Sequence, residues 1–249
     1  MLAATLCAAA VLLVAVPHAA GGPVRPVSPH WAGYVDTGTG AFTAVQATWV
    51  QPRIRCERPS SSVAFWVGLG GATATATGLE QIGTLATCSD NFLPSYSAWY
   101  ELIPVPADPV DVPVTVAPGD RLRAQVSVQE TTVALAIRNL TTGRAFSTQV
   151  TAASLDLSSA DWIVEAPPYC LIRCVSLPLA GFGTVTFKGA LASAGDRTGT
   201  IGDSAWTRQA MRLANGPTQP SAVPSALSGN GGSFSVRWRD ATRARRHRR

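Results

Sequence analysis

Apolar and polar residues alternate with a period of two along most of this chain, and turn residues separate the alternating runs. In residues 121–129, Leu122, Ala124, Val126 and Val128 form one face, and polar residues form the other. Such alternation is typical of a half-buried antiparallel strand. Comparable patterns predict strands around residues 44–50, 62–67, 96–103, 133–137, 145–150, 161–165, 182–188 and 233–238.

Gly, Pro, Asn and Asp punctuate these runs, as expected for tight turns. Gln129-Glu130 predicts a hairpin between two of the strands. Only residues 205–214 could form an amphipathic helix, and they alternate equally well as a strand. Many short strands with frequent turns predict an all-β sandwich or barrel rather than an α/β domain.

Composition supports one β domain with short additions at both ends. Charged residues make up 14% of the 249 residues, against roughly 25% in an average soluble domain. Residues 2–16 are apolar and uncharged, which predicts a secretory signal in residues 1–20. Residues 21–29 are interpreted as a linker, 30–238 as the folded domain and 239–249 as a disordered basic tail. No other stretch is long and apolar enough to span a membrane.

The net charge of +5 belongs to the C-terminal end. Residues 237–249 contain seven Arg and one Asp, so the rest of the chain is close to neutral. Nucleic-acid-binding domains carry basic residues on a folded face with interleaved aromatic residues. No stretch of residues 23–236 has that composition, so we expect no nucleic-acid partner.

Four cysteines lie outside the signal: Cys56, Cys88, Cys170 and Cys174. An even number in an exported chain predicts two disulfides, although sequence alone permits three connectivities. The short spacing of Cys170 and Cys174 would close a tight loop and leave Cys56 to pair with Cys88. A zinc site would need added His ligands or a C-x-x-C pair, so we expect no metal and no cofactor.

Catalysis by histidine has little support, because only His30 could lie in the folded domain. No G-x-S-x-G motif marks a serine nucleophile. The triplet Asp36-Thr37-Gly38 resembles that of pepsin-like aspartic proteases, but their mechanism needs a second carboxylate and no second triplet is present. We therefore interpret residues 36–40 as a hairpin turn.

Carboxylates and amides remain as candidates. Glu80, Glu101 and Glu165 each interrupt an apolar segment. Strand periodicity places Asp161, Ile163 and Glu165 on one face of residues 161–165, and it places Trp99 beside Glu101. These acids either line a binding groove or lie on an outer, solvated face.

The ordered segments resemble the glutamic peptidases, or eqolisins. The matching stretches are His30–Gly33, residues 44–52, Phe65–Leu69, Leu79–Gly83, Tyr96–Glu101, Gly119-Asp120, Asn139–Gly143, Asp161–Glu165 and Phe182–Phe187. The sequence departs from the family pattern at Gly70 and Ser97, where the family carries acids.

This resemblance implies an antiparallel β-sandwich of two curved, concanavalin-like sheets and a secreted endopeptidase. It assigns Glu165 as the general base on water, and Gln81 as the group that orients the water and stabilises the oxyanion. Trp66, Trp99 and Glu101 are implied to support the pair or contact substrate. The expected partners are protein or peptide substrates of a monomeric enzyme that works in acid solution. A carbohydrate-binding sandwich and a glycoside hydrolase are the alternatives, because the same fold serves many functions.

Overall fold

The computed structural model describes residues 27–38, 40–73, 76–104, 109–170, 174–214, 216, 219 and 221–240, without side chains for 168–176. The described residues form strands joined by turns and contain no helix. The strands are β1 (Val27–Ser28), β2 (Trp31–Thr37), β3 (Phe42–Val50), β4 (Ser62–Gly70), β5 (Leu79–Cys88), β6 (Pro94–Ile103), β7 (Val110–Val112), β8 (Arg121–Gln129), β9 (Thr132–Asn139), β10 (Ala145–Thr151), β11 (Ser159–Glu165), β12 (Pro168–Cys170), β13 (Cys174–Ser176), β14 (Thr184–Ala194), β15 (Arg197–Thr200), β16 (Thr207–Ala214), β17 (Ser221–Pro224) and β18 (Ser233–Arg239).

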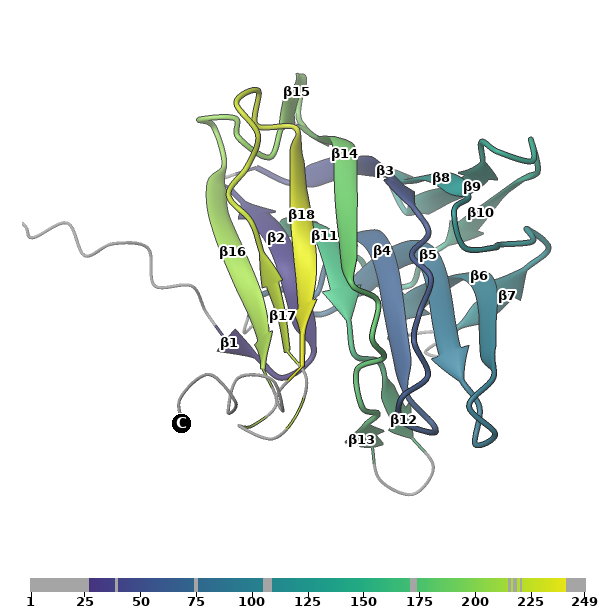
Figure 1. Ribbon diagram of the computed structural model, residues 1–249. Coiled ribbons are helices and arrows are strands. Elements are labelled where there is room, and N and C mark those ends of the chain that lie inside the picture. Colours follow the sequence, from purple (N-terminus) through teal and green to yellow (C-terminus); the bar gives the residue numbers. More distant parts are fainter. Residues whose placement is uncertain are drawn as a thin grey trace, which may run out of the picture.

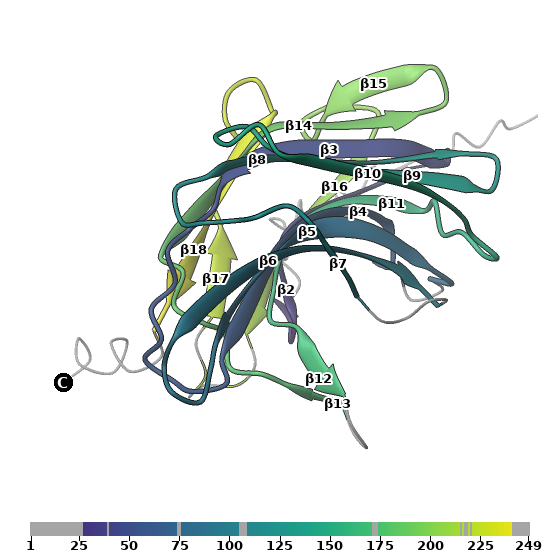
Figure 2. The ribbon, with the colours of Figure 1, turned by 90° about the vertical axis from the view of Figure 1, so that its right-hand side faces the viewer.

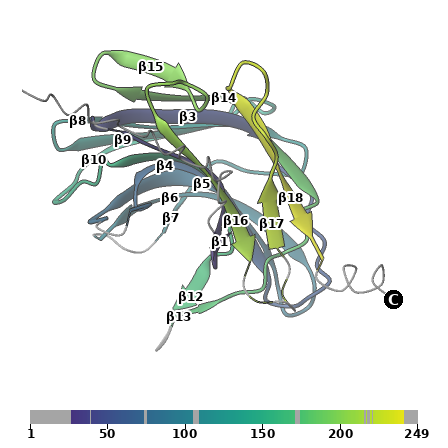
Figure 3. The same ribbon diagram turned by 90° about the vertical axis from the view of Figure 1, so that its left-hand side faces the viewer.

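Two layers face each other (Figure 1). The outer layer has the order β10-β9-β8-β3-β14-β18-β17, and the curved layer has the order β2-β11-β4-β5-β6-β7. Strand β16 joins them at one edge, since Thr207–Met211 pair with β2 whereas Leu213 and Ala214 pair with β17 (Figure 3). All pairings between these strands are antiparallel. The predicted antiparallel β-sandwich is confirmed.

The main core lies between the layers and is built by the alternation seen in the sequence. Leu122, Ala124, Val126 and Val128 of β8 are buried there, as their period of two predicts. Strand β4 is buried along its whole length, because the outer layer covers one of its faces and other side chains cover the second. The second face holds a separate apolar cluster that includes Trp66, Trp99 and Ile163.

The structure decides two local predictions, one on residues 205–214 and one on residues 36–40. Residues 205–214 contribute a strand, β16, rather than a helix. The predicted hairpin turn at residues 36–40 is wrong, because β2 pairs with β11 and β16 whereas β3 pairs with β8 and β14. This segment instead carries the chain from one layer to the other, and Asp36 lies inside β2. The predicted signal, most of the linker and residues 241–249 lie outside the described residues.

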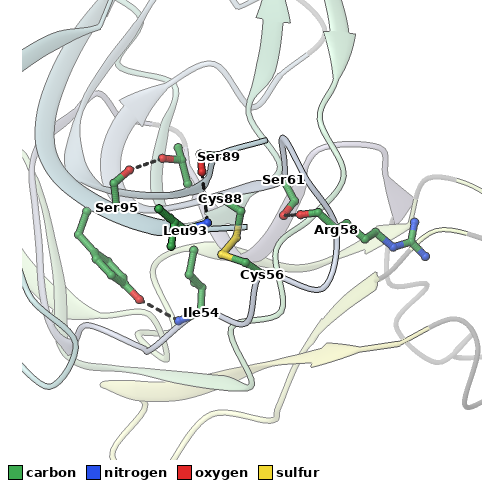
Figure 4. Close-up of a disulfide and its surroundings, with 10 residues drawn as sticks. Ile54, Cys56, Arg58, Ser61, Cys88, Ser89, Leu93 and Ser95 are labelled. Atoms are coloured by element: carbon green, nitrogen blue, oxygen red, sulfur yellow. Dashed lines mark hydrogen bonds between the residues drawn. A yellow bond between two sulfur atoms is a disulfide. The ribbon is translucent and has the colours of Figure 1, made fainter. Parts of the chain in front are cut away.

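A disulfide joins Cys56 to Cys88, at the end of β5 (Figure 4). Neighbouring hydrogen bonds hold the same region, including one from the Ile54 amide to the Tyr96 hydroxyl at 3.0 Å. Cys170 and Cys174 lie opposite each other in the register of β12 and β13. The side chains of these two residues are outside the described part of the structure, so the disulfide between them stays a prediction.

Removing the Cys56–Cys88 bond is expected to destabilise the fold substantially. The bond closes a loop with a sequence separation of 32. Chain entropy for a loop of that size predicts that Cys56→Ser combined with Cys88→Ser lowers the free energy of unfolding by about 3–4 kcal/mol. Urea unfolding of the double variant measures the loss, and an unchanged midpoint would contradict this prediction.

Candidate active site

The far face of the curved layer collects the candidate residues from separate strands. In the register, Ile163 of β11 lies opposite Trp66 of β4, which lies opposite Gly83 of β5 and then Trp99 of β6. Because side chains alternate along strands, Glu165 and Gln81 project to the same face as these residues. The curved layer bends away from the outer layer, so this far face is its concave side (Figure 2).

Glu165 is held by a tryptophan. Its Oε2 accepts a hydrogen bond of 2.8 Å from Trp66 Nε1. Burial raises the pKa of Glu165 to about 7, and hydrogen bonds from Trp66 and Trp31 oppose that rise. The two indoles meet edge to face with centroids 5.1 Å apart. Glu165 is therefore a fixed carboxyl group that exchanges its proton near neutral pH.

Gln81 is held by a carboxylate on the neighbouring strand. Gln81 and Glu101 lie directly opposite each other in β5 and β6, and Gln81 Nε2 donates to Glu101 Oε2 at 2.5 Å. Gln81 is buried, and its Oε1 has no hydrogen-bond partner among the described residues. This pairing directs one amide hydrogen to Glu101 and leaves the second hydrogen and Oε1 for another group.

Glu165 and Gln81 share a face but do not touch. Glu165 lies opposite Ala64 of β4, whereas Gln81 lies opposite Gly68, four positions further along that strand. The Trp66 indole fills the interval between them. Its Nε1 bonds to Glu165, and its Cζ3 lies 3.0 Å from the position that a Cβ on Gly68 would take. The same position is 3.2 Å from Gln81 Cβ.

Glu80, one of the three acids that the sequence singled out, projects to the opposite face. It precedes Gln81 and points into the main core, with both carboxyl oxygens unpartnered among the described residues. Burial and the nearby Asp156 carboxylate raise the pKa of Glu80 to about 8. Glu80 thus belongs to the protein interior and not to the concave face.

Asp36 also faces the main core, on the side opposite Gln81. Burial raises its pKa to about 8, although the nearby Arg208 lowers it. Neither carboxyl oxygen has a hydrogen-bond partner in the described structure. Since it lies on the other face of the layer, Asp36 does not join Glu165 and Gln81 in one site.

Asp161 is a buried acid on the concave face for which sequence reasoning assigned no role. It lies two strands from Gln81 in the same row, with Gly68 between them. Burial raises the pKa of Asp161 well above its usual range, and Ser159 Oγ donates to its Oδ2 at 3.2 Å. The alternation of side chains in residues 161–165 predicted that Asp161 lies on this face. Only the register of β11, β4 and β5 shows that it lies level with Gln81.

The described residues contain no group of three or more His, Cys, Asp or Glu side chains placed to hold a metal ion. No helix in the described part of the chain is long and apolar enough to cross a membrane.

Solved structures with this arrangement of strands include peptidases. Scytalido-glutamic peptidase with a peptide-based transition state analog is 25% identical, with a TM-score of 0.71, over 85% of this chain and 98% of that chain. Aspergilloglutamic peptidase from Aspergillus niger is 27% identical, with a TM-score of 0.58, over 72% of this chain and 99% of that chain. SCP-B, a member of the Eqolisin family in complex with the tripeptide Ala-Ile-His, is 24% identical with a TM-score of 0.68, over 85% of this chain and 98% of that chain.

No match was found among curated protein sequences. The model of the Peptidase A4 family matches residues 29–229, which include every strand of the curved layer. The resemblance to glutamic peptidases is thereby confirmed, and the chain belongs to the Peptidase A4 family.

Proposed function

We propose that this peptidase cleaves peptide bonds with Glu165 and Gln81 acting from opposite ends of the Trp66 indole. The observation that carries the proposal is that both groups project to one concave face and that each is fixed by a partner. Trp66 holds the Glu165 carboxyl, and Glu101 holds the Gln81 amide. Fixed catalytic groups lower the cost of reaching the reactive geometry.

Glu165 is the general base in this mechanism. Its carboxylate takes a proton from a water molecule, which attacks the carbonyl carbon of the scissile bond. The protonated Glu165 then donates that proton to the leaving amine. A pKa of about 7 suits both steps, because each form of the carboxyl is accessible near neutral pH.

Gln81 stabilises the oxyanion. The separation of Gln81 from Glu165 along β4 supports this role over direct orientation of the water. The path from base to oxyanion donor is about 10 Å long: roughly 3 Å from base to water, 3 Å from water to the attacked carbon, about 1.2 Å along the C=O bond and 3 Å to the donor. The Nε2 hydrogen that does not face Glu101 is the donor.

Glu101, Trp66 and Trp99 support this pair. Glu101 fixes which end of the Gln81 amide carries the donor, and Trp66 is the floor between the two groups. Trp66 and Trp99 are 0% and 6% exposed. Such closed rings do not offer the open stacking surface that a carbohydrate-binding module needs, which favours the peptidase over that alternative.

The same groups define a working pH range. Below about pH 5 Glu165 is mostly protonated and cannot act as a base, so the proposed optimum is weakly acid rather than strongly acid. The apolar residues 2–16 support export of the chain to such surroundings. Hydrolysis of casein that is insensitive to pepstatin and to chelators would support the assignment, and complete inhibition by pepstatin would contradict it.

Replacing Trp66 with phenylalanine is expected to move the pH profile. The indole N–H lowers the pKa of Glu165, so Trp66→Phe raises that pKa and moves the acid limb of kcat/KM to higher pH. The matched control is Trp99→Phe, because Trp99 Nε1 has no partner among the described residues. If the acid limb moved equally in both variants, the limb would not report the ionisation of Glu165, and the prediction would be wrong.

A further inference from the structure

Acidic and basic residues are segregated between the two layers. The strands of the curved layer contain six acidic residues and no Lys or Arg: Asp36, Glu80, Glu101, Asp111, Asp161 and Glu165. The strands of the outer layer contain six basic residues and no Asp or Glu: Arg121, Arg123, Arg138, Lys188, Arg237 and Arg239. The nearly neutral charge of the folded domain therefore conceals a strong polarity between its layers.

All six basic side chains are exposed, and they gather on the outward face of the outer layer, which we call the basic face. Lys188, Arg123 and Arg138 lie in one row across the strands, with Thr48 between the first two. Arg121 lies two residues from Arg123 in β8. Arg237 of β18 lies opposite Thr184 of β14, and Thr184 is four residues from Lys188. Neighbouring strands are about 5 Å apart and alternate residues of a strand about 7 Å apart, so Arg121, Arg138 and Lys188 each lie within about 10 Å of Arg123, whereas Arg237 and Arg239 extend the basic face along β18.

Acidic side chains do not neutralise this patch. The ion pairs among the described residues join Arg55 to Glu57 and Arg197 to Asp203, and neither involves the basic face. Arg123 instead donates to the Gln46 side chain at 2.8 Å. Exposed cations that cluster around Arg123 and take no part in these ion pairs favour binding of a polyanion.

The basic face is hollowed beside its arginines. Two adjoining hollows of about 260 and 380 Å³ run along β8, β9 and β10, and they share Gln125, Ala136 and Ser147. Arg123 and Arg138 lie at one end of them. A groove with small and hydroxyl-bearing walls that leads from paired arginines fits a narrow linear chain.

We propose that the basic face binds a linear polymer of phosphate diesters that carries no bases, such as a polyol phosphate of a cell surface. Five of the six cations are arginine, whose planar guanidinium matches phosphate oxygens in a fork. Phosphate diesters keep their charge in acid solution, where carboxylate polymers begin to lose theirs near pH 4. The outward positions of the described outer-layer strands hold no Phe, Trp or Tyr to stack on bases, which disfavours a nucleic acid.

This surface lies on the side of the sandwich opposite the concave face (Figure 2). A protein attached through the basic face keeps the face with Glu165 and Gln81 free for substrate. Binding to the polymer and hydrolysis of a small peptide are therefore independent properties that can be measured separately.

The test measures binding of the full chain to soluble poly(glycerol phosphate) at pH 6 over a series of salt concentrations. The variant Arg123→Gln, Arg138→Gln, Lys188→Gln is expected to bind at least tenfold more weakly and to lower the slope of log K against log salt by about 2. Hydrolysis of a short peptide is expected to be unchanged, because none of the three residues lies on the concave face.

The matched control removes the same charge from the C-terminal segment by Arg243→Gln, Arg245→Gln and Arg246→Gln. We expect its affinity to change less than threefold. Loss of binding in the control but not in the first variant would overturn the proposal, because the tail would then carry the interaction. Tighter binding of single-stranded DNA with the same number of phosphates, or of polygalacturonate, would overturn the assignment of the polymer.

Discussion

The variant Glu165→Gln is expected to lose roughly 10² to 10⁴ in kcat and to remain folded. The carboxyl is the only proton acceptor that the proposed mechanism uses, and general base catalysis contributes roughly 10² to 10⁴ in rate. Glutamine has the same shape and can still accept the hydrogen bond from Trp66 Nε1. Steady-state hydrolysis of a peptide, together with the unfolding midpoint, measures the loss and checks the fold.

Gln81→Ala is the companion variant, with an expected loss of about 10² to 10³ in kcat for one oxyanion donor. It also leaves Glu101 without its partner, so Gln81→Glu serves as a second variant that keeps the volume but cannot donate when ionised. The control is Gln149→Ala on the outer layer, which the mechanism does not use. Normal activity in either Glu165→Gln or Gln81→Ala would refute the pair.

Strand periodicity predicted much of this arrangement. Alternation in residues 161–165 placed Asp161 and Glu165 on one face, and alternation in residues 96–103 placed Trp99 beside Glu101. The structure has both. These predictions succeed because a period of two depends only on the backbone of one strand.

Relations between strands could not be predicted in the same way. The pairing of Gln81 with Glu101 and the distance along β4 between Gln81 and Glu165 depend on the register, which is set by loops and core packing across the whole layer. The error at residues 36–40 has the same origin. Gly and Thr there suggested a tight turn, but burial of Asp36 and Tyr34 between the layers makes β2 the partner of β11 and β16.

Buried acids are the second feature that the sequence did not reveal. Asp36, Glu80 and Asp161 are 0% exposed. Ionising a carboxyl in such surroundings is costly, and the few hydrogen bonds to these groups do not offset the cost, so burial raises the pKa of each. The protein tolerates them because each is neutral in acid solution, where the carboxyl behaves as a small polar group rather than as a charge.

The free energy of unfolding is therefore expected to fall as the pH rises from about 4 to about 8. A carboxyl whose pKa is higher in the folded state stabilises the fold fully below its unfolded pKa, and this stability is lost as pH rises through the folded value. For Asp36 the pKa rises from 3.8 to about 8. That difference corresponds to at most about 6 kcal/mol. The variant Asp36→Asn keeps the neutral shape, so it should match the parent near pH 4 and be more stable than the parent at pH 8.

The control is Asp196→Asn, which removes the same charge from an exposed turn. Urea unfolding at a series of pH values measures the three curves. A parent curve that is flat or rises between pH 4 and 8, or an Asp36→Asn curve parallel to it, would show that the buried carboxyls do not govern stability.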